Sequence, residues 1–397
     1  MCHSRKVVLQ RRGPLWFYLV DSKTRIFSFL ALGFLSGMSQ TLVLRAHCEA
    51  GRVSLEHVGL VESAAPAEAD VPPGGLLVRL LCLSADPYLR AGFAARGGRK
   101  PGEALSGFVS GEVVASRSSL WRAGELFGAH LPFSSVQVVA EAGVGALRRL
   151  GGLPGFRGAE DVSLGIGALG MPGATAYGGL IDVLRPTGAG GEVLLVTAAS
   201  GAVGALVGQI AKRKFGCRVI GTAGTPEKCA RLTGVLGFDA AVCYKDAATG
   251  APLSTEQLEA AFRAAAGPAG KLDMVFENVG GPAFDAAFLC LGQGGRIAVC
   301  GSIANYNDGR RVAAQPAFDP MRMIYTAQRV EGFVCGPWLS GARGSFLQDM
   351  AAWRAEGMFI ADETVFGEEK GPLDARWCAA FDSLFSGSHL GKVVVRV

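Results

Sequence analysis

The residues best suited to chemistry form a run of small side chains between two apolar stretches. The run Ala199-Ser200-Gly201-Ala202-Val203-Gly204 follows the apolar residues 193–196 and leads into an Ala/Val/Ile-rich helical pattern. Its spacing approximates G-x-G-x-x-G, in which one glycine admits a phosphate and the last lets the helix approach the strand. The free N–H groups at the start of such a helix bind phosphate. The run predicts a dinucleotide-binding turn, although small residues between a strand and a helix also serve packing alone.

The residues after this turn indicate which dinucleotide would bind. The pattern predicts strands at 217–222 and 240–243, with a helix between them that begins after Thr225 as N-cap. Two such strand–helix units predict a parallel, doubly wound sheet. An NAD-binding fold places an acid about 20 residues past the glycines, whereas this chain has Lys228 and Arg231. These cations favour NADP(H), although exposed cations on a helix also form a solvated face.

The composition describes a globular chain without a nucleic-acid partner. The 397 residues are 49% hydrophobic and 18% charged, which suits a chain of two domains. Six Lys and Arg residues among the first 38 face one acid, and the remaining 33 cations balance 33 acids. Such a neutral body gives no case for nucleic-acid binding. The ten cysteines form no C-x-x-C pair, which indicates reduced thiols and a cytoplasmic location.

The first 37 residues allow three interpretations. Residues 26–35 are an apolar run of ten, too short to span a bilayer but similar in length to a signal-peptide core. The basic, acid-poor flanks also suit an organellar transit peptide. We favour the third interpretation, in which residues 1–38 are an N-terminal extension from the gene model and the strand pattern begins at Met38. We expect no stable membrane span.

The strand pattern changes along the chain. Residues 41–167 show short strands separated by Pro and Gly clusters, which predicts an all-β module ahead of the α/β one. After the α/β region the chain returns to short strands. The clearest predicted strands lie at 75–83, 107–116, 137–140, 273–277, 296–301, 329–335, 364–366 and 392–397, and two late helices lie near 345–356 and 373–385.

Six motifs occur between residues 83 and 307: L-S-A-D-P-Y-L-R (83–90), G-M-P-G-A-T-A-Y (170–177), A-A-S-G-A-V-G (198–204), F-E-N-V-G-G (276–281), G-R-I-A-V-C-G (295–301) and N-Y-N (305–307). Together they resemble the zinc-independent medium-chain reductases, and within them the prostaglandin reductases and the alkenal and leukotriene double-bond reductases. The similarity runs from about residue 41 to the C-terminus, in the family's order and spacing. Residues 225–233 and 237–245 are most similar to prostaglandin reductases that act on 15-oxo-prostaglandins.

The resemblance implies a two-domain α/β fold built from both ends of the chain. It predicts a GroES-like β domain from residues 39–168 and 341–397, and an inserted Rossmann domain with a doubly wound parallel sheet from residues 169–340. Family members are often dimers that share a sheet edge, which implies a homodimer for this chain.

The residues argue against zinc. Catalytic zinc needs three Cys, His or carboxylate ligands, and structural zinc needs four closely spaced cysteines. The chain has five histidines, and Ser84-Ala85-Asp86 stands where zinc-using relatives place a metal cysteine. We therefore predict no metal. Asp86 and Tyr88 are candidates for the substrate side, although a D-P-Y turn is also structural when Asp86 bonds backbone N–H groups ahead of Pro87.

Without a metal or an acid–base pair, the cofactor must supply the chemistry. Hydride addition to an α,β-unsaturated carbonyl pushes negative charge onto the oxygen, so the site needs a hydrogen-bond donor there. Tyr306 is the predicted donor because it follows the strand 296–301 at the edge where ligands of open α/β sheets bind. In the family the matching tyrosine donates to the substrate carbonyl or holds the nicotinamide ribose.

The resemblance also implies the cofactor contacts. Gly201, Ala202, Val203 and Gly204 match the pyrophosphate turn, and Lys228 and Tyr244 match contacts to the 2′-phosphate. The remaining matches lie along the ribose and nicotinamide or in the C-terminal turn, where His389 stands in place of the family's asparagine. They are Asn278, Cys300, Gly301, Ser302, Ile303, Ala304, Asn305, Tyr306, Phe333, Val334, Cys335 and His389.

Two departures from the family pattern bear on binding and substrate. His389 can still donate a hydrogen bond, and we expect it to give cofactor binding a pH dependence near its unperturbed pKa of about 6.5. The loop 92–102 lacks the tyrosine that prostaglandin-reducing relatives often place over the substrate. Its cations Arg96, Arg99 and Lys100 are candidates for a fatty-acid carboxylate, and equally for solvated loop charges.

The predicted function is NADPH-dependent reduction of the C=C bond in α,β-unsaturated ketones or aldehydes. The substrates would be 15-oxo-prostaglandins or other lipid-derived enones and alkenals. Two alternatives remain at this point: a quinone oxidoreductase on the same fold, and a nucleotide-binding protein without turnover.

Overall fold

The computed structural model describes residues 37–308 and 319–397. The chain divides into two units, Met1–Met38 and Ser39–Val397, and the second holds almost all of the described residues. The apolar run at 26–35, with the three interpretations attached to it, lies outside them. No single helix in the described part of the chain is long and apolar enough to cross a membrane.

A six-stranded parallel sheet forms the α/β part of the fold. Its strand order is β10-β9-β8-β11-β12-β13, so the chain starts in the middle, builds one half and then returns to build the other. This is the order 3-2-1-4-5-6 of dinucleotide-binding folds. The strands are β8 Val193–Val196, β9 Arg218–Ala223, β10 Ala240–Cys243, β11 Leu272–Glu277, β12 Leu291–Val299 and β13 Arg329–Gly332.

Alternate residues of these strands enter two separate cores because successive side chains point to opposite faces. Leu194 and Phe276 pack into one core, while Leu195 and Val275 pack into the other. Both faces are therefore apolar, as buried parallel strands require. The sheet holds its side chains away from water on both faces and leaves only the strand ends for ligands.

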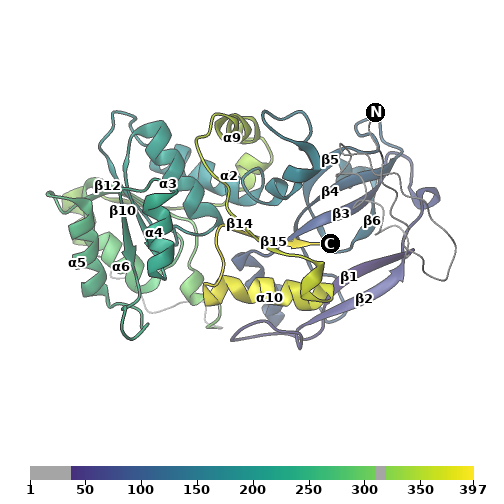
Figure 1. Ribbon diagram of the computed structural model, residues 1–397, viewed down its shortest axis with the longest axis horizontal. Helices are drawn as coiled ribbons and strands as arrows, with labels where there is room; N and C mark the ends of the chain where they lie inside the picture. The colour runs from purple at the N-terminus through teal and green to yellow at the C-terminus, as the bar shows by residue number, and fades with distance from the viewer. Residues whose placement is uncertain (1–36, 309–318) are drawn as a thin grey trace, which may run out of the picture. The chain divides into compact units, whose positions relative to one another are not determined.

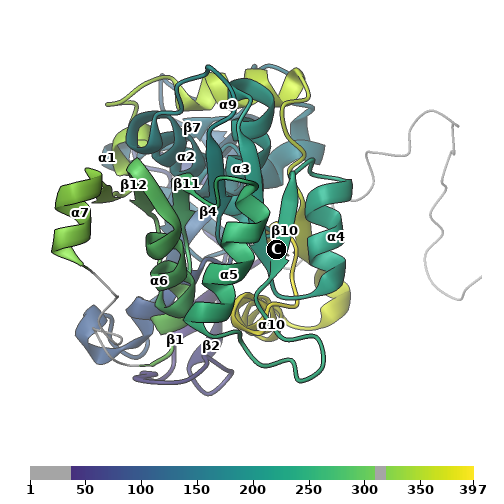
Figure 2. The same ribbon diagram turned by 90° about the vertical axis from the view of Figure 1, so that its left-hand side faces the viewer.

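Helices cover both faces of the sheet. Residues of α2 Met171–Gly178, α3 Ala202–Phe215, α4 Pro226–Gly234 and α9 Phe346–Ala355 share the first core, and α5 Thr255–Ala266 and α6 Gly281–Cys290 supply the second. Figure 2 shows α5 and α6 side by side along the sheet. Three short helices complete this part: a π-helix at Gly179–Leu184, α7 Pro320–Thr326 and α8 Gly336–Leu339.

The second sheet draws on both ends of the described chain. Strand β15 Lys392–Arg396 pairs antiparallel with β3 Leu76–Ser84 and parallel with β14 Glu363–Phe366, as the yellow and blue strands of Figure 1 show. The order is β14-β15-β3-β4-β5-β7, with β6 also on β3. The other strands are β4 Ser106–Ser116, β5 Leu126–Pro132, β6 Val136–Val139, β7 Arg148–Arg149 and the separate pair β1 Met38–Leu44 and β2 Val58–Ala64.

An aromatic core holds the C-terminal helix α10 Leu373–Ser386 against this sheet. Trp377 stacks on Phe381 at 4.9 Å between ring centroids, and Phe93 lies 6.0 Å from both. Trp377 and Phe93 are at most 1% exposed. The C-terminal helix is thus part of the β module's core. Helices α1 Glu141–Val144 and the 3₁₀ segments Pro87–Phe93 and Gly158–Ile166 complete the β module.

The predicted fold class is confirmed, with shifts at element ends. The strand predicted at 296–301 begins at Leu291 and ends at Val299, because Leu291 already pairs with Leu272 of β11. The strand predicted at 329–335 ends at Gly332. Thr225 caps α4 as predicted, its side chain accepting a hydrogen bond from Lys228 N. The domain boundaries given above stay predictions.

A buried ion pair joins two neighbouring strands of the β sheet, β15 and β3, that are far apart in sequence. Lys392 Nζ lies 3.1 Å from Asp86 Oδ1, and both side chains are 4% exposed. Lys392 Nζ also donates to the carbonyls of Ala85 and Val393, and Ser84 Oγ donates to Asp86. Asp86 therefore bonds side chains rather than the backbone N–H groups that the D-P-Y turn suggested.

Removing Lys392 leaves a carboxylate buried without its cation, and we expect K392M to lower the free energy of unfolding by about 3–5 kcal/mol. The exposed pair Arg52–Asp382 offers a matched control, because R52M breaks an ion pair whose side chains are 53% and 40% exposed. That variant should lose less than about 1 kcal/mol. Urea unfolding of both variants measures the difference. Equal losses would show that the buried pair does not stabilise the fold.

Candidate functional site

The predicted cofactor residues follow the carboxyl ends of the parallel strands. Ligands of open α/β sheets bind at this edge, beside the point where the strand order reverses. That point lies between β8 and β11. Segments from six strands meet the edge: 197–204 after β8, 224 after β9, 244–245 after β10, 278–280 after β11, 300–306 after β12 and 333–335 after β13.

The glycine turn has the geometry that phosphate binding needs. Gly201 is the N-cap of α3 and has no side-chain hydrogen bond at this cap, so the first N–H groups of the helix lack a side-chain acceptor. A Cβ on Gly204 would stand 2.6 Å from the carbonyl oxygen of Ala198, so the helix approaches the strand as closely as predicted. Ala198 itself adopts φ +49°, a strained conformation for alanine.

The C-terminal turn touches the glycine turn directly. Gly391 N donates to the carbonyl of Ser200 at 2.8 Å, and Gly391 forms a parallel bridge with Gly201. Gly391 has φ +58°, and a Cβ there would lie 1.9 Å from the Asp362 carbonyl oxygen, so only glycine fits. Two segments almost 190 residues apart in sequence thus form one wall of the predicted site.

Three side chains gather around Gly224, where the 2′-phosphate was predicted. Tyr244 Oη would lie 2.9 Å from a Cβ at Gly224, and Lys245 Nζ lies 5.7 Å from the Tyr244 ring centre. Burial and the charge of Lys245 lower the pKa of Lys228. The ion pairs among the described residues include neither lysine, so no described carboxylate competes with an anion for either of them. Lys245 is absent from the predicted set, and its place next to Tyr244 in the sequence was the signal that could have identified it.

The Lys228 ammonium already has partners in the C-terminal turn. Its Nζ donates to the carbonyls of Gly387 and His389 at 2.6 Å each. Arg231, the other cation of this helix, pairs with Asp362, its Nε lying 2.8 Å from Oδ2. Lys228 therefore links the predicted phosphate site to the turn that carries His389, whereas Arg231 is occupied by a carboxylate.

His389 differs from its expected behaviour. Its Nδ1 lies 2.9 Å from the Ser383 carbonyl oxygen, which can only accept, so Nδ1 carries the proton and Nε2 carries the lone pair. Burial, together with the charges of Lys228 and Lys392, lowers the pKa of His389 to about 4. The expected pH dependence of cofactor binding near 6.5 is therefore wrong, because the imidazole is already neutral there.

Tyr306 lies on the loop after β12, in the segment that begins with the 3₁₀ turn Ile303–Asn305. Its Oη accepts a hydrogen bond from Ser302 N at 3.3 Å, which leaves the hydroxyl proton free to donate. Burial raises the pKa of Tyr306, so the hydroxyl stays protonated at neutral pH. Asn305 Nδ2 donates to Ser302 Oγ at 2.6 Å and tightens the same loop.

Two of the family motifs meet at Asn307. Arg90, at the end of the L-S-A-D-P-Y-L-R motif, is 2% exposed, and its Nε donates to Asn307 Oδ1 at 3.1 Å. The Asn307 carbonyl accepts from Gly51 N at 2.7 Å. The loop that carries Tyr306 is therefore anchored to the β module as well as to the parallel sheet.

Asn278 is held by a residue that the prediction omitted. Its N donates to Thr197 Oγ1 at 2.8 Å, and its Nδ2 donates to the Thr197 carbonyl at 2.7 Å. Thr197 in turn donates to Glu277 Oε2 at 3.1 Å. Glu277 is also absent from the predicted set. An acid at the end of the apolar strand 272–277 was the sequence signal that could have found it.

The segment after β13 contributes an aromatic contact, an exposed valine and a half-buried cysteine. Phe333 packs against Phe276 with ring centroids 6.0 Å apart, and Val334 is 76% exposed. Cys335 begins α8, and burial raises the pKa of its thiol. Burial also raises the pKa of Cys300 to about 12. Both thiols are therefore protonated at neutral pH. Because the thiolate is the nucleophilic form, neither cysteine is suited to act as a nucleophile.

The β module presents aromatic side chains and two cations near this edge. Phe108 lies edge-on to Tyr88 and His130, with ring centroids 6.3 and 5.3 Å away. The electrostatic neighbours of Tyr88 include Cys335 and Arg99. Arg99 donates to Ser106 Oγ at 3.0 Å, so this predicted loop cation has a protein partner, while Arg96 and Lys100 are exposed.

Arg148 is the second cation. It lies on β7 opposite Gly128 and donates one long hydrogen bond, from Nη2 to the Gly165 carbonyl at 3.4 Å. Its Nε is buried without a partner, and the described ion pairs do not include it. Burial lowers the pKa of Arg148 to about 10, and Cys335 opposes that shift. The guanidinium thus has one buried N–H donor, at Nε, without a hydrogen-bond partner.

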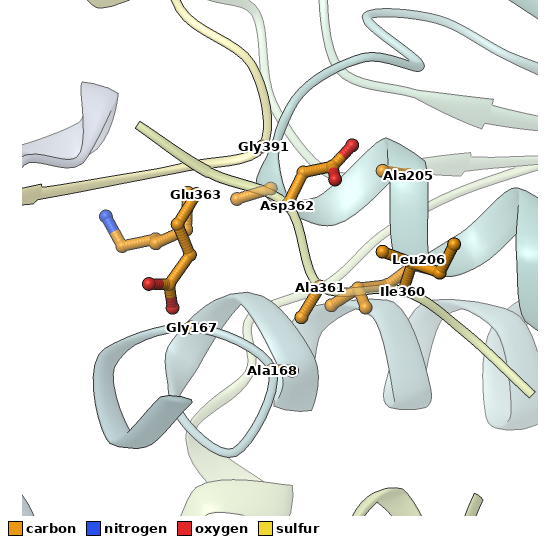
Figure 3. Close-up of a pocket in the computed structure, with 11 residues that line it drawn as sticks. Gly167, Ala168, Ala205, Leu206, Ile360, Ala361, Asp362, Glu363 and Gly391 are labelled. Carbon is orange, nitrogen blue, oxygen red and sulfur yellow. The ribbon is translucent and has the colours of Figure 1, made fainter. Parts of the chain in front are cut away.

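A small cavity lies beside α3, and its lining includes Ala202 of the glycine turn and Gly391 of the C-terminal turn. Figure 3 shows residues 360–363 along one stretch of chain beside Ala205 and Leu206, with Gly391 next to Asp362. Its volume of about 10 Å³ is near the minimum that one water molecule needs. The cavity is a packing gap between α3 and the C-terminal segment and is too small for a cofactor.

Comparison with known proteins gives the family. A model described as zinc-binding dehydrogenase matches residues 202–352. Prostaglandin reductase 1 of Rattus norvegicus is 39% identical over 331 residues, which are 82% of this chain and 92% of that protein. The chain belongs to the prostaglandin reductase family of medium-chain dehydrogenase/reductases. Among the described residues, no group of three or more His, Cys, Asp or Glu side chains could hold a metal ion.

Two further reductases extend the similarity. The NADP⁺-dependent 2-alkenal reductase of Nicotiana tabacum is 33% identical over 336 residues, which are 82% of the present chain and 89% of the Nicotiana protein. The crystal structure of CurA in complex with NADPH, from Vibrio vulnificus, is 30% identical with a TM-score of 0.73. It covers 90% of this chain and 99% of CurA.

The low pKa of His389 predicts how the reductase responds to acid. Between pH 6.5 and 4 the unfolded chain binds a proton on His389 and the folded chain does not, so stability falls as pH falls through this window. Between pH 7 and pH 5, we expect the free energy of unfolding of H389N to fall by about 1–2 kcal/mol less than that of the wild type. Urea unfolding at both pH values measures it. Parallel losses in both proteins would contradict a buried neutral imidazole.

Proposed function

We propose that this protein reduces the C=C bond of α,β-unsaturated ketones and aldehydes with NADPH. The observation that carries the proposal is the Tyr306 hydroxyl at the carboxyl edge of the sheet, with its oxygen hydrogen-bonded by Ser302 N–H and its proton free. Relatives named as a prostaglandin reductase and an NADP-dependent alkenal reductase support the reaction class.

The residues at the sheet edge fit NADPH. The start of α3 offers N–H groups without a side-chain cap to a pyrophosphate, and the two lysines near Gly224 offer positive charge to a 2′-phosphate. We assign the first role to Gly201–Gly204 and the second to Lys228, Tyr244 and Lys245. Bound NADPH supplies a hydride for the β-carbon of the enone.

The remaining predicted cofactor residues fit the nicotinamide end. Asn278 and the loop from Cys300 to Tyr306 border one side, and Phe333 to Cys335 border the other, since they follow the neighbouring strands β11, β12 and β13. His389 borders the glycine turn through the C-terminal segment and offers Nε2 as an acceptor only. These assignments are proposals that rest on position.

Tyr306 has the properties of a donor to the substrate oxygen. Negative charge develops on that oxygen as the β-carbon is reduced, and a hydrogen bond already in place stabilises it. The raised pKa of Tyr306 keeps the hydroxyl protonated, and the bond from Ser302 fixes the direction of the remaining proton. The α-carbon then takes a proton from solvent.

The β module suggests a lipid acid as substrate. Tyr88, Phe108 and His130 form a mainly apolar aromatic contact, which suits an alkyl chain. Arg148 adds a guanidinium whose Nε lacks a partner and which no described carboxylate pairs with. A 15-oxo-prostaglandin or an oxo-fatty acid carries both a chain and a carboxylate, so we assign Arg148 to the carboxylate.

Assembly and location stay predictions. A homodimer through the six-stranded sheet is supported by β13, whose one neighbour in that sheet is β12, so that its outer side is an edge. A cytoplasmic location is supported by the nine cysteines of the described residues, which are all free thiols.

The central test compares wild type and Y306F in reduction of a 15-oxo-prostaglandin and a medium-chain alkenal, followed by NADPH absorbance and product analysis. The wild type should consume NADPH and give the saturated carbonyl. Loss of one hydrogen bond to a developing charge should lower kcat in Y306F about 10²–10³-fold, with the Kd for NADPH nearly unchanged.

A simple quinone and NADH serve as controls in the same assay. Preference for the quinone over both enones would favour the quinone oxidoreductase alternative. Binding of NADPH without consumption of any acceptor would favour the nucleotide-binding alternative and contradict the proposed function.

The role of Arg148 predicts a difference between an acid and its ester. R148Q should raise KM for a 15-oxo-prostaglandin about tenfold or more, because one charge-assisted bond is lost, and leave KM for its methyl ester unchanged. R149Q is the matched control, because the neighbouring guanidinium pairs with Glu125. Equal effects of R148Q on acid and ester would refute the assignment.

A further inference from the structure

Glu277 is a fully buried acid at the centre of the site edge. It ends β11, is 0% exposed, and lies beside the point where the strand order reverses. The described ion pairs do not include it, and the groups that act on its charge are Thr197 and the N–H groups of Val279 and Gly280. A buried carboxyl without a cation costs free energy, which its hydrogen bonds offset in part.

Each carboxyl oxygen of Glu277 holds a different loop. Oε1 accepts from Val279 N and Gly280 N at 2.6 Å each, which fixes the turn between β11 and α6. Oε2 accepts from Thr197 Oγ1 at 3.1 Å, which fixes the first residue after β8. The Glu277 backbone carbonyl accepts from Cys300 N at 2.9 Å, after β12. One residue therefore ties together the loops of three adjacent strands.

The direction of these bonds extends the network to Asn278. Thr197 Oγ1 accepts from Asn278 N at 2.8 Å, so its own proton points to Glu277. The Thr197 carbonyl accepts from Asn278 Nδ2 at 2.7 Å. Asn278 is consequently held at both its backbone and its side chain by Thr197.

The loop that carries Tyr306 depends on the same turn. Ile303 N donates to the Asn278 carbonyl at 3.2 Å, and Ala304 N donates to the Val279 carbonyl at 3.1 Å. A Cβ at Gly280 would lie 2.3 Å from Ser302 Oγ, so the turn and the loop are in close contact. A shift of the turn at 278–280 would displace the loop 302–306 with it.

We propose that Glu277 is a positioning residue that, through Thr197 and the turn Asn278–Gly280, holds the Tyr306 loop in place for the nicotinamide end of NADPH. The inference rests on the proposed function for its catalytic consequence. We expect Glu277 to have no effect on the adenosine end of the cofactor. Lys228, Tyr244 and Lys245 follow β9 and β10, which lie on the opposite side of β8 from β11. Burial raises the pKa of Glu277 to about 7, while the two backbone N–H groups oppose that shift.

The experiment measures the two ends of the cofactor separately in E277Q, T197V and T197S. E277Q keeps the shape but replaces one acceptor oxygen of the carboxyl with an NH2 donor, and T197V keeps the shape and loses the hydroxyl. Both should weaken NADPH binding about tenfold or more, the size of one hydrogen bond to a charged group. Adenosine 2′-monophosphate, which lacks both the pyrophosphate and the nicotinamide end, should bind all variants as it binds the wild type. T197S keeps the hydroxyl and should restore NADPH affinity.

Steady-state kinetics and urea unfolding complete the test. E277Q and T197V should raise KM for NADPH and lower kcat, while E259Q, on the surface of α5 in an ion pair with Arg263, should change neither. Parallel loss of affinity for both nucleotides, or unchanged NADPH affinity in E277Q, would overturn the proposal. Because binding is measured without turnover, a wild type that binds NADPH but reduces no enone would refute the proposed function and leave this inference testable.

Discussion

The parallel pairing of β8 with β11 is the constraint on which the site depends. Leu194, Leu195 and Val196 pair with Met274, Val275 and Phe276, and the alternating side chains fill the cores on both faces of the sheet. Because both faces are covered, backbone groups without a partner occur at the strand ends. The two strands end together, so Thr197 and Glu277 are adjacent and connect the first loops of the two half-sheets.

The C-terminal segment makes the site part of both modules. It bonds the glycine turn through Gly391 and Ser200, and it enters the β sheet through the buried pair of Lys392 and Asp86. Arg90 and Asn307 connect the same two parts on the side of Tyr306. The glycine turn after β8 and the loop that carries Tyr306 are therefore fixed against the β module by hydrogen bonds from residues distant in sequence.

The elements and the edge of the site could be predicted, whereas several partners could not. Thr225 caps α4 as its residue type predicts, because a cap depends on neighbours within three residues. The start of β12 could not be predicted, since Gly292 and Gly294 favour a turn locally and pairing of Leu291 with β11 overrides that preference. His389 titrates far below its usual range because burial and two lysines act on it, and neither effect is visible in its local sequence.

The sequence by itself determined the order of the elements, the glycine turn after β8 and the positions that reach the carboxyl edge, because these follow from side-chain periodicity and from turn residues within a few positions. Only the tertiary structure decided which charges are paired. Arg231 and Asp86 are occupied by Asp362 and Lys392, whereas Lys245 and Arg148 remain available. The physical reason is that burial and Coulomb interactions act through space: Lys392 stands 306 residues from Asp86 in sequence and 3.1 Å from it in the fold.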